Sequence, residues 1–272
     1  MSRLPLPADW LVPDWPAPPG VRAVCTTRSC PAGDAPSAAP WGGFNLADHV
    51  GDAPQAVASH RAALAACTGA RPVFLKQMHG CHVAELDAYA PDGQPADAAV
   101  TASSGVACTV MVADCLPVLL ARADGAAVAA AHAGWRGLAG GVIEAAAQAV
   151  RRLGPHPPAS AASATSAVEV VAWLGPCIGP DAFEVGPEVR AAFTAARPEA
   201  AACFSPRPGG KWLAHLPALA RQRLAALGIP AWGNDGSPAW CTFSQPQLFH
   251  SYRARPVTGR MAACIWLARG ES

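Results

Sequence analysis

Residues 106–137 carry the sequence VACTVMVADCLPVLLARADGAAVAAAHAGWRG, and this stretch decides the fold. Val106 to Val112 and Val118 to Ala121 are short apolar runs, which predict two buried strands. Asp124-Gly125 predicts a tight turn, after which Ala126 to Ala131 forms a third strand. A hairpin of this kind joins antiparallel strands, so we expect a mixed sheet rather than a wholly parallel one.

Elements on both sides of this centre complete the predicted fold. Gly134 to Gly137 turns the third strand into a helix that runs to about Leu153. Elsewhere the sequence predicts a helix over Ala53–Thr68, a strand over Val73–Val83 broken by Gly80, a loop over Pro155–Ala167, a strand over Val168–Leu174, helices over Pro187–Ala196 and His215–Leu227, and a closing strand over Gly259–Ala268. Strands and helices interleave, which predicts a single-domain α/β (α+β) fold with mixed, stacked β layers flanked by helices. Residues 1–43, rich in Pro, Gly and Trp, are expected to form an irregular or edge-strand entry segment of that same domain rather than a separate one.

Composition excludes several classes of protein. Of 272 residues, 51% are hydrophobic and 14% are charged, and 20 Lys and Arg against 19 Asp and Glu give a net charge of +1. The chain can bury a core but lacks the basic field of nucleic-acid binders, so no nucleic-acid partner is expected. Polar residues interrupt its longest apolar run, so no membrane association is expected. The N-terminus has no secretory signal, which indicates the cytoplasm, where the ten cysteines stay reduced.

Three residues stand where predicted strands give way to loops: His79 in KQMHG, Cys115 in ADCLP and His132 in AAHAGWRG. Two imidazoles and one thiolate make a three-ligand zinc set, and an open fourth position is typical of catalytic zinc. Cys115 and His132 are equally suited to serve as the nucleophile and base of a cysteine hydrolase. Purely structural roles for all three are a further alternative that the residues alone leave open.

Two more side chains are candidates for substrate binding. Arg136 follows the strand-to-helix turn, where its guanidinium and the first N–H groups of the helix suit a phosphate or carboxylate. Gln77 lies two residues before His79 and is expected on the same strand face. A solvated or ion-paired arginine and a half-exposed strand position are the simpler interpretations. The eight histidines include no H-x-H pair, so a multicopper oxidase centre is not expected.

Taken in order, KQMHG, ADAAVT, ADCLPVLL, AAHAGWRGLAGGV, LGPCIGPDAFEVG, CTF, FHSYR and GRMAACIWL resemble the YfiH-type laccase-domain family, now regarded as purine nucleoside phosphorylases. The resemblance spans roughly Phe44 to Leu267 and implies a Cys/His hydrolase-like fold, with residues 44–272 as the catalytic domain. It implies a metal on His79, Cys115 and His132, which would also be the catalytic residues. Zinc is the expected metal, with copper as the alternative.

The resemblance also implies an activity. It predicts phosphorolysis of adenosine, inosine and guanosine, cleavage of methylthioadenosine, and deamination of adenosine, with purine nucleosides and phosphate as partners. Asn45, within FNL, and Arg61 fall in family motifs and join Gln77 and Arg136 as expected substrate-binding residues.

Two features leave the activity open. His60 stands where the family often has Asn, and Leu248 stands where it often has Phe, which affects the expected substrate preference. Within the family, the alternative activity is a cysteine-type amidase that edits peptidoglycan precursors through Cys115 and His132. We expect a monomer or a homodimer.

Overall fold

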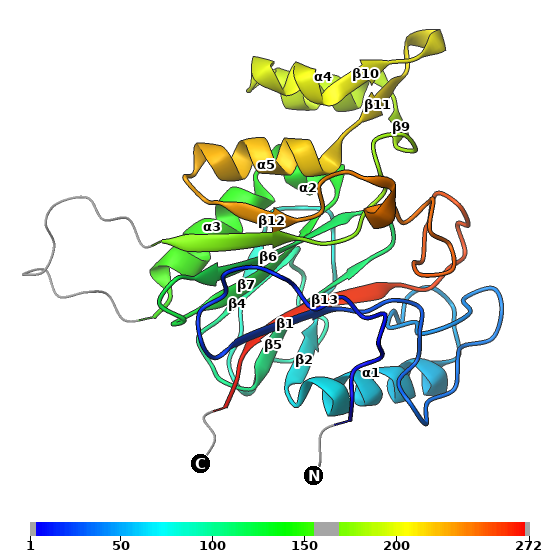
Figure 1. Ribbon diagram of the computed structural model, residues 1–272, viewed down its shortest axis with the longest axis vertical. Helices are drawn as coiled ribbons and strands as arrows, with labels where there is room; N and C mark the ends of the chain where they lie inside the picture. Colours follow the sequence, from blue (N-terminus) through cyan, green and yellow to red (C-terminus); the bar gives the residue numbers. More distant parts are fainter. Residues whose placement is uncertain (1–3, 155–168, 270–272) are drawn as a thin grey trace, which may run out of the picture.

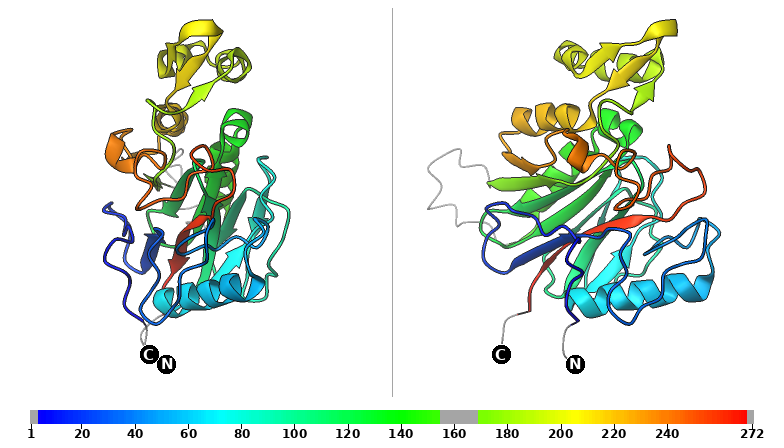
Figure 2. Two further views of the ribbon diagram at one scale, coloured as in Figure 1. Left: turned by 90° about the vertical axis from the view of Figure 1, so that its right-hand side faces the viewer. Right: turned by 45° about the vertical axis from the view of Figure 1, so that its right-hand side comes forward.

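The computed structural model describes residues 4–154 and 169–269, and two stacked β-sheets lie between outer helices (Figures 1 and 2). The first sheet has four strands in the order β1-β13-β5-β2, which cover Val21–Cys25, Met261–Leu267, Val106–Val112 and Arg71–Phe74. Strand β5 is antiparallel to β13 and parallel to β2, so this sheet is mixed.

The second sheet has six strands in the order β12-β8-β6-β7-β4-β3. They cover Ala231–Gly233, Val170–Leu174, Leu116–Arg122, Val128–Ala133, Ala98–Thr101 and Val83–Glu85. Strands β6 and β7 form the antiparallel hairpin expected at Asp124-Gly125, where Gly125 adopts a φ of 74°. A residue with a side chain rarely adopts that conformation, which explains glycine at the turn.

Alternation along β6 explains why the layers stack. Val118 and Leu120 pack into the core beneath the helices, whereas Leu119 and Ala121 pack into the core between the two sheets. Both faces of the strand are therefore buried, as its continuous apolar sequence predicts.

Helices close the two outer faces of this stack. Helix α1 (Pro54–Thr68) covers the four-stranded sheet, and α3 (Val142–Arg152), with α5 (Leu216–Ala226) beside it, covers the six-stranded one (Figure 1). The predicted layers of β-sheet flanked by helices are confirmed.

A small lobe stands away from the stack, at the top of Figure 1. It holds helix α4 (Pro187–Thr194) and a sheet in the order β10-β11-β9, which cover Phe204–Pro206, Trp212–Ala214 and Glu184–Val185. Three short 3-10 helices complete the described elements: η1 (Pro198–Cys203) and η2 (Pro208–Gly210) in the lobe, and η3 (Pro238–Trp240) before the last strand. The sequence does not predict this small sheet, because each of its strands is only two or three residues long.

Two predicted elements are wrong in detail. The helix expected from residue 134 to Leu153 is divided into α2 (Trp135–Gly140) and α3, because Gly141 adopts a left-handed φ of 102°. The strand expected over Val73–Val83 forms only at its two ends, since β2 ends at Phe74 and the chain loops from there to β3, which begins at Val83. The loop predicted over 155–167 lies outside the described residues. No helix within residues 4–154 and 169–269 is long and apolar enough to cross a membrane.

Candidate metal centre

A cavity of about 470 Å³ opens where β5 ends, β6 begins and β7 ends. Its walls include the β5–β6 turn, the start of α2 and the loop that precedes β13. A second cavity of about 410 Å³ adjoins it, and the two share His49 and Gln77 in their walls. Cavities of this size suit small organic ligands.

The three predicted metal ligands come together on the wall of the larger cavity. The donor atoms of His79, Cys115 and His132, which we call the triad, lie within 4.8 Å of one another. The hairpin explains two of these positions, because Pro117 on β6 pairs with His132 on β7 and Cys115 directly precedes β6. His79 comes from the loop after β2, where its backbone adopts a left-handed φ of 60°. Its Nε2 lies 3.9 Å from Sγ of Cys115.

Asp97 holds two members of the triad in place. Its Oδ1 lies 2.9 Å from Nδ1 of His132, which leaves Nε2 of that ring for the metal centre. The same carboxylate accepts the backbone N–H groups of Met78, His79 and Gly80 at 3.0, 2.8 and 2.7 Å. Burial alone would raise the pKa of Asp97, but the hydrogen bonds from His132 and Gly80 lower it. The carboxylate therefore fixes both the imidazole of His132 and the loop that carries His79.

Cys115 and His132 shift each other's protonation. Burial would raise the pKa of the Cys115 thiol, but the charge of His132 and hydrogen bonds from both histidines lower it below its usual range. Burial would likewise lower the pKa of His132, but the Cys115 charge and the Asp97 hydrogen bond raise it. The site thus favours a thiolate, which is the form of cysteine that binds metals and attacks electrophiles.

The residues of the triad fit a zinc ion. In a tetrahedral zinc site the bonds to zinc are about 2.0–2.3 Å long, so neighbouring donor atoms lie about 3.3–3.8 Å apart. The donor atoms of the triad lie within 4.8 Å of one another, so they would have to move closer together to bind zinc. A Cβ built on Gly134 would lie 2.9 Å from Sγ of Cys115 and 3.0 Å from Cδ2 of His79. Glycine therefore keeps the space in front of these donors open. Copper accepts the same nitrogen and sulfur donors, so the triad alone does not select between the two metals.

Three guanidinium groups line the same cavity, those of Arg136, Arg253 and Arg260. Arg136 is exposed, and its Cζ lies 4.4 Å from the centre of the Trp135 ring. In the described part of the chain its guanidinium has no hydrogen-bond or ion-pair partner, whereas Arg253 and Arg260 each donate to a backbone carbonyl. Helix α2 spans only six residues, so these side chains, rather than the helix start, give the cavity its attraction for anions.

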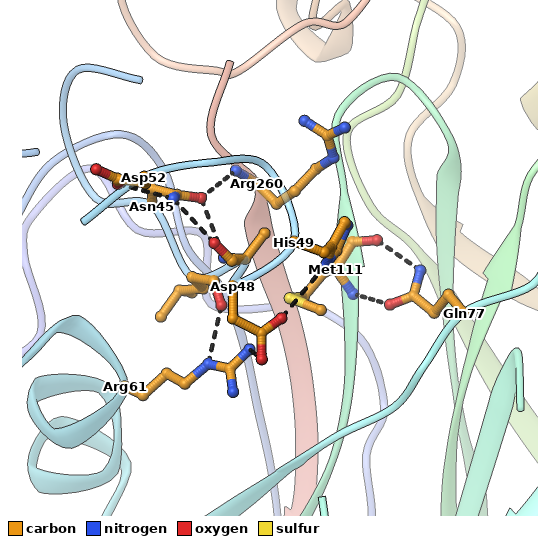
Figure 3. A network of polar contacts seen from close by, with 10 residues as sticks. Asn45, Asp48, His49, Asp52, Arg61, Gln77, Met111 and Arg260 are labelled. Carbon is orange, nitrogen blue, oxygen red and sulfur yellow. Dashed lines mark hydrogen bonds and ion pairs between the residues drawn. The ribbon is translucent and has the colours of Figure 1, made fainter. Parts of the chain in front are cut away.

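The remaining predicted binding residues lie in different places (Figure 3). Gln77 lines the cavity from a loop rather than a strand, and its amide pairs with both backbone groups of Met111 at 2.7 and 2.8 Å. Arg61 lines the adjoining cavity, with its Nη2 3.2 Å from Asp48. Asn45 is fully buried and reaches neither cavity.

Known proteins with similar sequences show the family to which the chain belongs. A family model described as multi-copper polyphenol oxidoreductase laccase matches residues 22–268. The chain belongs to this family. Family members with curated names include a Pseudomonas aeruginosa purine nucleoside phosphorylase, which is 46% identical over 259 residues, covering 95% of this chain and 98% of the relative. Purine nucleoside phosphorylase YfiH of Escherichia coli is 43% identical over 260 residues, covering 94% and 98%.

Solved structures of relatives share the fold. A protein from Neisseria meningitidis aligns with a TM-score of 0.84 at 43% identity, covering 96% of this chain and 100% of that one. YlmD from Geobacillus stearothermophilus aligns with a TM-score of 0.80 at 26% identity, covering 99% and 100%. The mixed α/β fold is therefore that of the family.

Sequence reasoning missed two polar residues near the triad. Asp97 lies in the ADAAVT motif, but nothing in the motif itself indicates that its carboxylate holds a histidine. A charged residue directly before an apolar strand is the one signal that points to it. His49 lines the larger cavity from a loop far from the triad in sequence, and no pattern around it indicates this.

Proposed function

We propose that this protein is a zinc-dependent phosphorylase of purine nucleosides, which transfers a ribosyl group from a purine base to inorganic phosphate. The observation that carries the proposal is one cavity that joins the triad to three guanidinium groups. Relatives of 46% and 43% identity, aligned over nearly their whole length, carry the name purine nucleoside phosphorylase. The proposed substrates are adenosine, inosine, guanosine and methylthioadenosine, and the proposed location is the cytoplasm.

The triad would hold zinc through two imidazole nitrogens and the Cys115 thiolate. When bound, zinc supplies a Lewis acid that polarises an oxygen atom in the open position. Asp97 would orient His132 for the metal: its carboxylate accepts a hydrogen bond from Nδ1, which leaves Nε2 as the metal ligand. Deamination of adenosine is a second activity that we propose for this cavity, because a nucleoside bound there lies beside the metal centre.

Arg136 is the proposed phosphate ligand. Its guanidinium lies on the cavity wall, and the described residues leave its donors unpaired. A guanidinium binds phosphate through two parallel hydrogen bonds and can hold it for attack on the anomeric carbon. Phe183 and Tyr252 line the same walls and offer aromatic faces to a purine ring.

One specific arrangement favours a second candidate. Cys115, His132 and Asp97 stand in the order thiol, imidazole and carboxylate that cysteine hydrolases use. A cysteine-type amidase that edits peptidoglycan precursors would use Cys115 to attack the amide carbon, with His132 as its base. The three guanidinium groups have no part in that chemistry, so we rank it second.

Phosphate dependence separates the two functions. Inosine should release hypoxanthine rapidly in phosphate buffer and slowly without phosphate.

Arg136→Ala should raise the KM for phosphate about 10- to 100-fold, because a hydrogen bond to a charged group contributes about 1.5–3 kcal/mol. Arg152→Ala, at the exposed end of α3, is the matched control and should leave that KM unchanged. Equal inosine cleavage with and without phosphate, or hydrolysis of an aminoacyl cell-wall precursor without inosine cleavage, would refute the phosphorylase.

A further inference from the structure

His49 occupies a position that neither the triad nor the proposed phosphate site explains. It lies in the loop between the entry segment and α1, and it contributes to the walls of both cavities. Its side chain is 61% exposed, so a ligand in the larger cavity can reach it.

The loop that carries His49 is firmly anchored (Figure 3). The buried Asn45 amide donates to the carbonyl of Ala47 and to Asp52, and its oxygen accepts the N–H groups of Ala47 and Arg260. Asn45 thus ties both ends of the His49 loop to the start of β13. A substrate would therefore meet an imidazole at a fixed position rather than on a free loop.

Asp48 lies beside the imidazole, and Arg61 contacts Asp48 in turn. Oδ1 of Asp48 lies 3.5 Å from Nδ1 of His49, and Oδ2 of the same carboxylate lies 3.2 Å from Nη2 of Arg61. Arg61 is held in turn by the carbonyl of Leu46 and by the face of Phe74, whose centre lies 4.0 Å from Cζ. Because Nδ1 lies 3.5 Å from Asp48, we take Nε2 of His49 as the nitrogen that serves a ligand in the cavity.

The other titratable groups on the described cavity wall are less suited to donate a proton. The triad is committed to the metal in the proposed function. The two oxygens of Asp114 accept hydrogen bonds from Thr242 Oγ1 and from the backbone N–H of Arg253, both at 2.6 Å, so both are already engaged within the protein. A guanidinium group does not give up its proton in proteins, and Tyr252 offers its ring face to the purine in the proposed function.

We infer that His49 is the general acid that protonates the departing purine, an assignment that rests on the proposed phosphorolysis. A phosphate oxygen forms a bond to the anomeric carbon while the bond from that carbon to N9 breaks. The electron pair of the broken bond passes to the purine, whose N7 takes the proton from Nε2 of His49. The imidazole becomes neutral and regains a proton from solvent. Asp48 and Arg61 are positioning residues in this step.

The test compares two leaving groups in the His49→Ala variant. Inosine needs a proton on its base to leave, whereas the base of 7-methylguanosine already carries a methyl group and a positive charge at N7. Loss of a general acid should lower kcat for inosine about 100-fold and kcat for 7-methylguanosine less than about threefold. Added imidazole should restore part of the inosine activity. His82→Ala removes an exposed histidine outside both cavities and should change neither rate.

Each other outcome has a distinct meaning. Unchanged inosine turnover in His49→Ala, or equal loss on both substrates without imidazole rescue, would overturn the assignment of His49. If the wild-type protein cleaves inosine but not 7-methylguanosine, imidazole rescue alone decides. If the wild-type protein leaves inosine intact in phosphate buffer, the proposed function itself fails, before any variant is compared.

Discussion

Oδ1 of Asp97 lies 2.9 Å from Nδ1 of His132, and both side chains are almost fully buried. This pair joins two strands of the six-stranded sheet to the loop that carries His79, because the same carboxylate accepts three backbone N–H groups of that loop. The geometry of the candidate metal centre therefore depends on a residue outside the triad.

Asp97→Asn tests that dependence. An amide at this position presents an N–H group to donors, so His132 and the loop at His79 lose their orientation. We expect zinc affinity to fall about 10- to 100-fold, as for other groups that orient metal ligands. Competition with a chromogenic chelator measures this, with Asp87→Asn, an exposed carboxylate in a turn, as the control. Unchanged affinity in Asp97→Asn would show that the centre forms without the pair.

Metal content gives a direct prediction for the triad. The purified protein should carry about one zinc per chain, since two imidazoles and a thiolate with an open position are typical of catalytic zinc. Cys115→Ser and His132→Ala should lose most of it, while Cys30→Ser, a half-buried thiol outside both cavities, should keep it. Elemental analysis decides, and full occupancy in both triad variants would place the ligands elsewhere.

Oxygen consumption tests the oxidase description attached to the family. The eight histidines include no H-x-H pair, and among the described residues the triad is the group of side chains that could hold a metal. A blue-copper site with a trinuclear cluster needs more ligands than this. We expect no stoichiometric oxygen uptake with phenols unless copper is added. Uptake at typical enzyme turnover, about 1 s⁻¹ or more, without added copper would contradict this.

His250 makes the stability of the protein depend on pH. It is buried, and burial together with the charge of Arg28 lowers its pKa to about 3. Below pH about 6.5 the unfolded chain takes up a proton at this residue that the folded chain excludes, so the free energy of unfolding falls as pH falls. From pH 7 to pH 5 the advantage of wild type over His250→Gln should shrink by about 1–2 kcal/mol.

Urea unfolding at the two pH values measures this difference. The exposed His82→Gln variant is the control and should track the wild type at both. A gap between wild type and His250→Gln that is the same at pH 7 and pH 5 would show that His250 is protonated in the folded protein.

Local sequence signals predict much of the fold. The apolar runs around the Asp124-Gly125 turn give three central strands, and helix α1 begins within one residue of its predicted start at Ala53. The signals fail where a long-range contact overrides them. The segment after Phe74 has the composition of a strand, but the N–H groups of Met78, His79 and Gly80 donate to Asp97 instead of to a neighbouring strand. The Gly140-Gly141 pair carried the signal for the helix break.

In the candidate site, too, local sequence signals predict some features and long-range contacts determine the others. The triad could be predicted because its members stand where the sequence predicts that strands give way to loops, close to a glycine or proline. The contact between Asp97 and His132 could not be predicted from the sequence, since it depends on the pairing of β4 with β7. The position of His49 also depends on tertiary structure, because the Asn45 network ties its loop to the start of β13.

The fate of the phosphate oxygens tests the central claim most directly. Inosine is incubated with the protein and with phosphate carrying oxygen-18 at all its positions, and the sugar product is analysed by phosphorus NMR and mass spectrometry. Phosphorolysis at the anomeric carbon predicts ribose 1-phosphate that retains every labelled oxygen, together with hypoxanthine. Unlabelled free ribose as the sugar product, with the labelled phosphate unchanged, would contradict the claim.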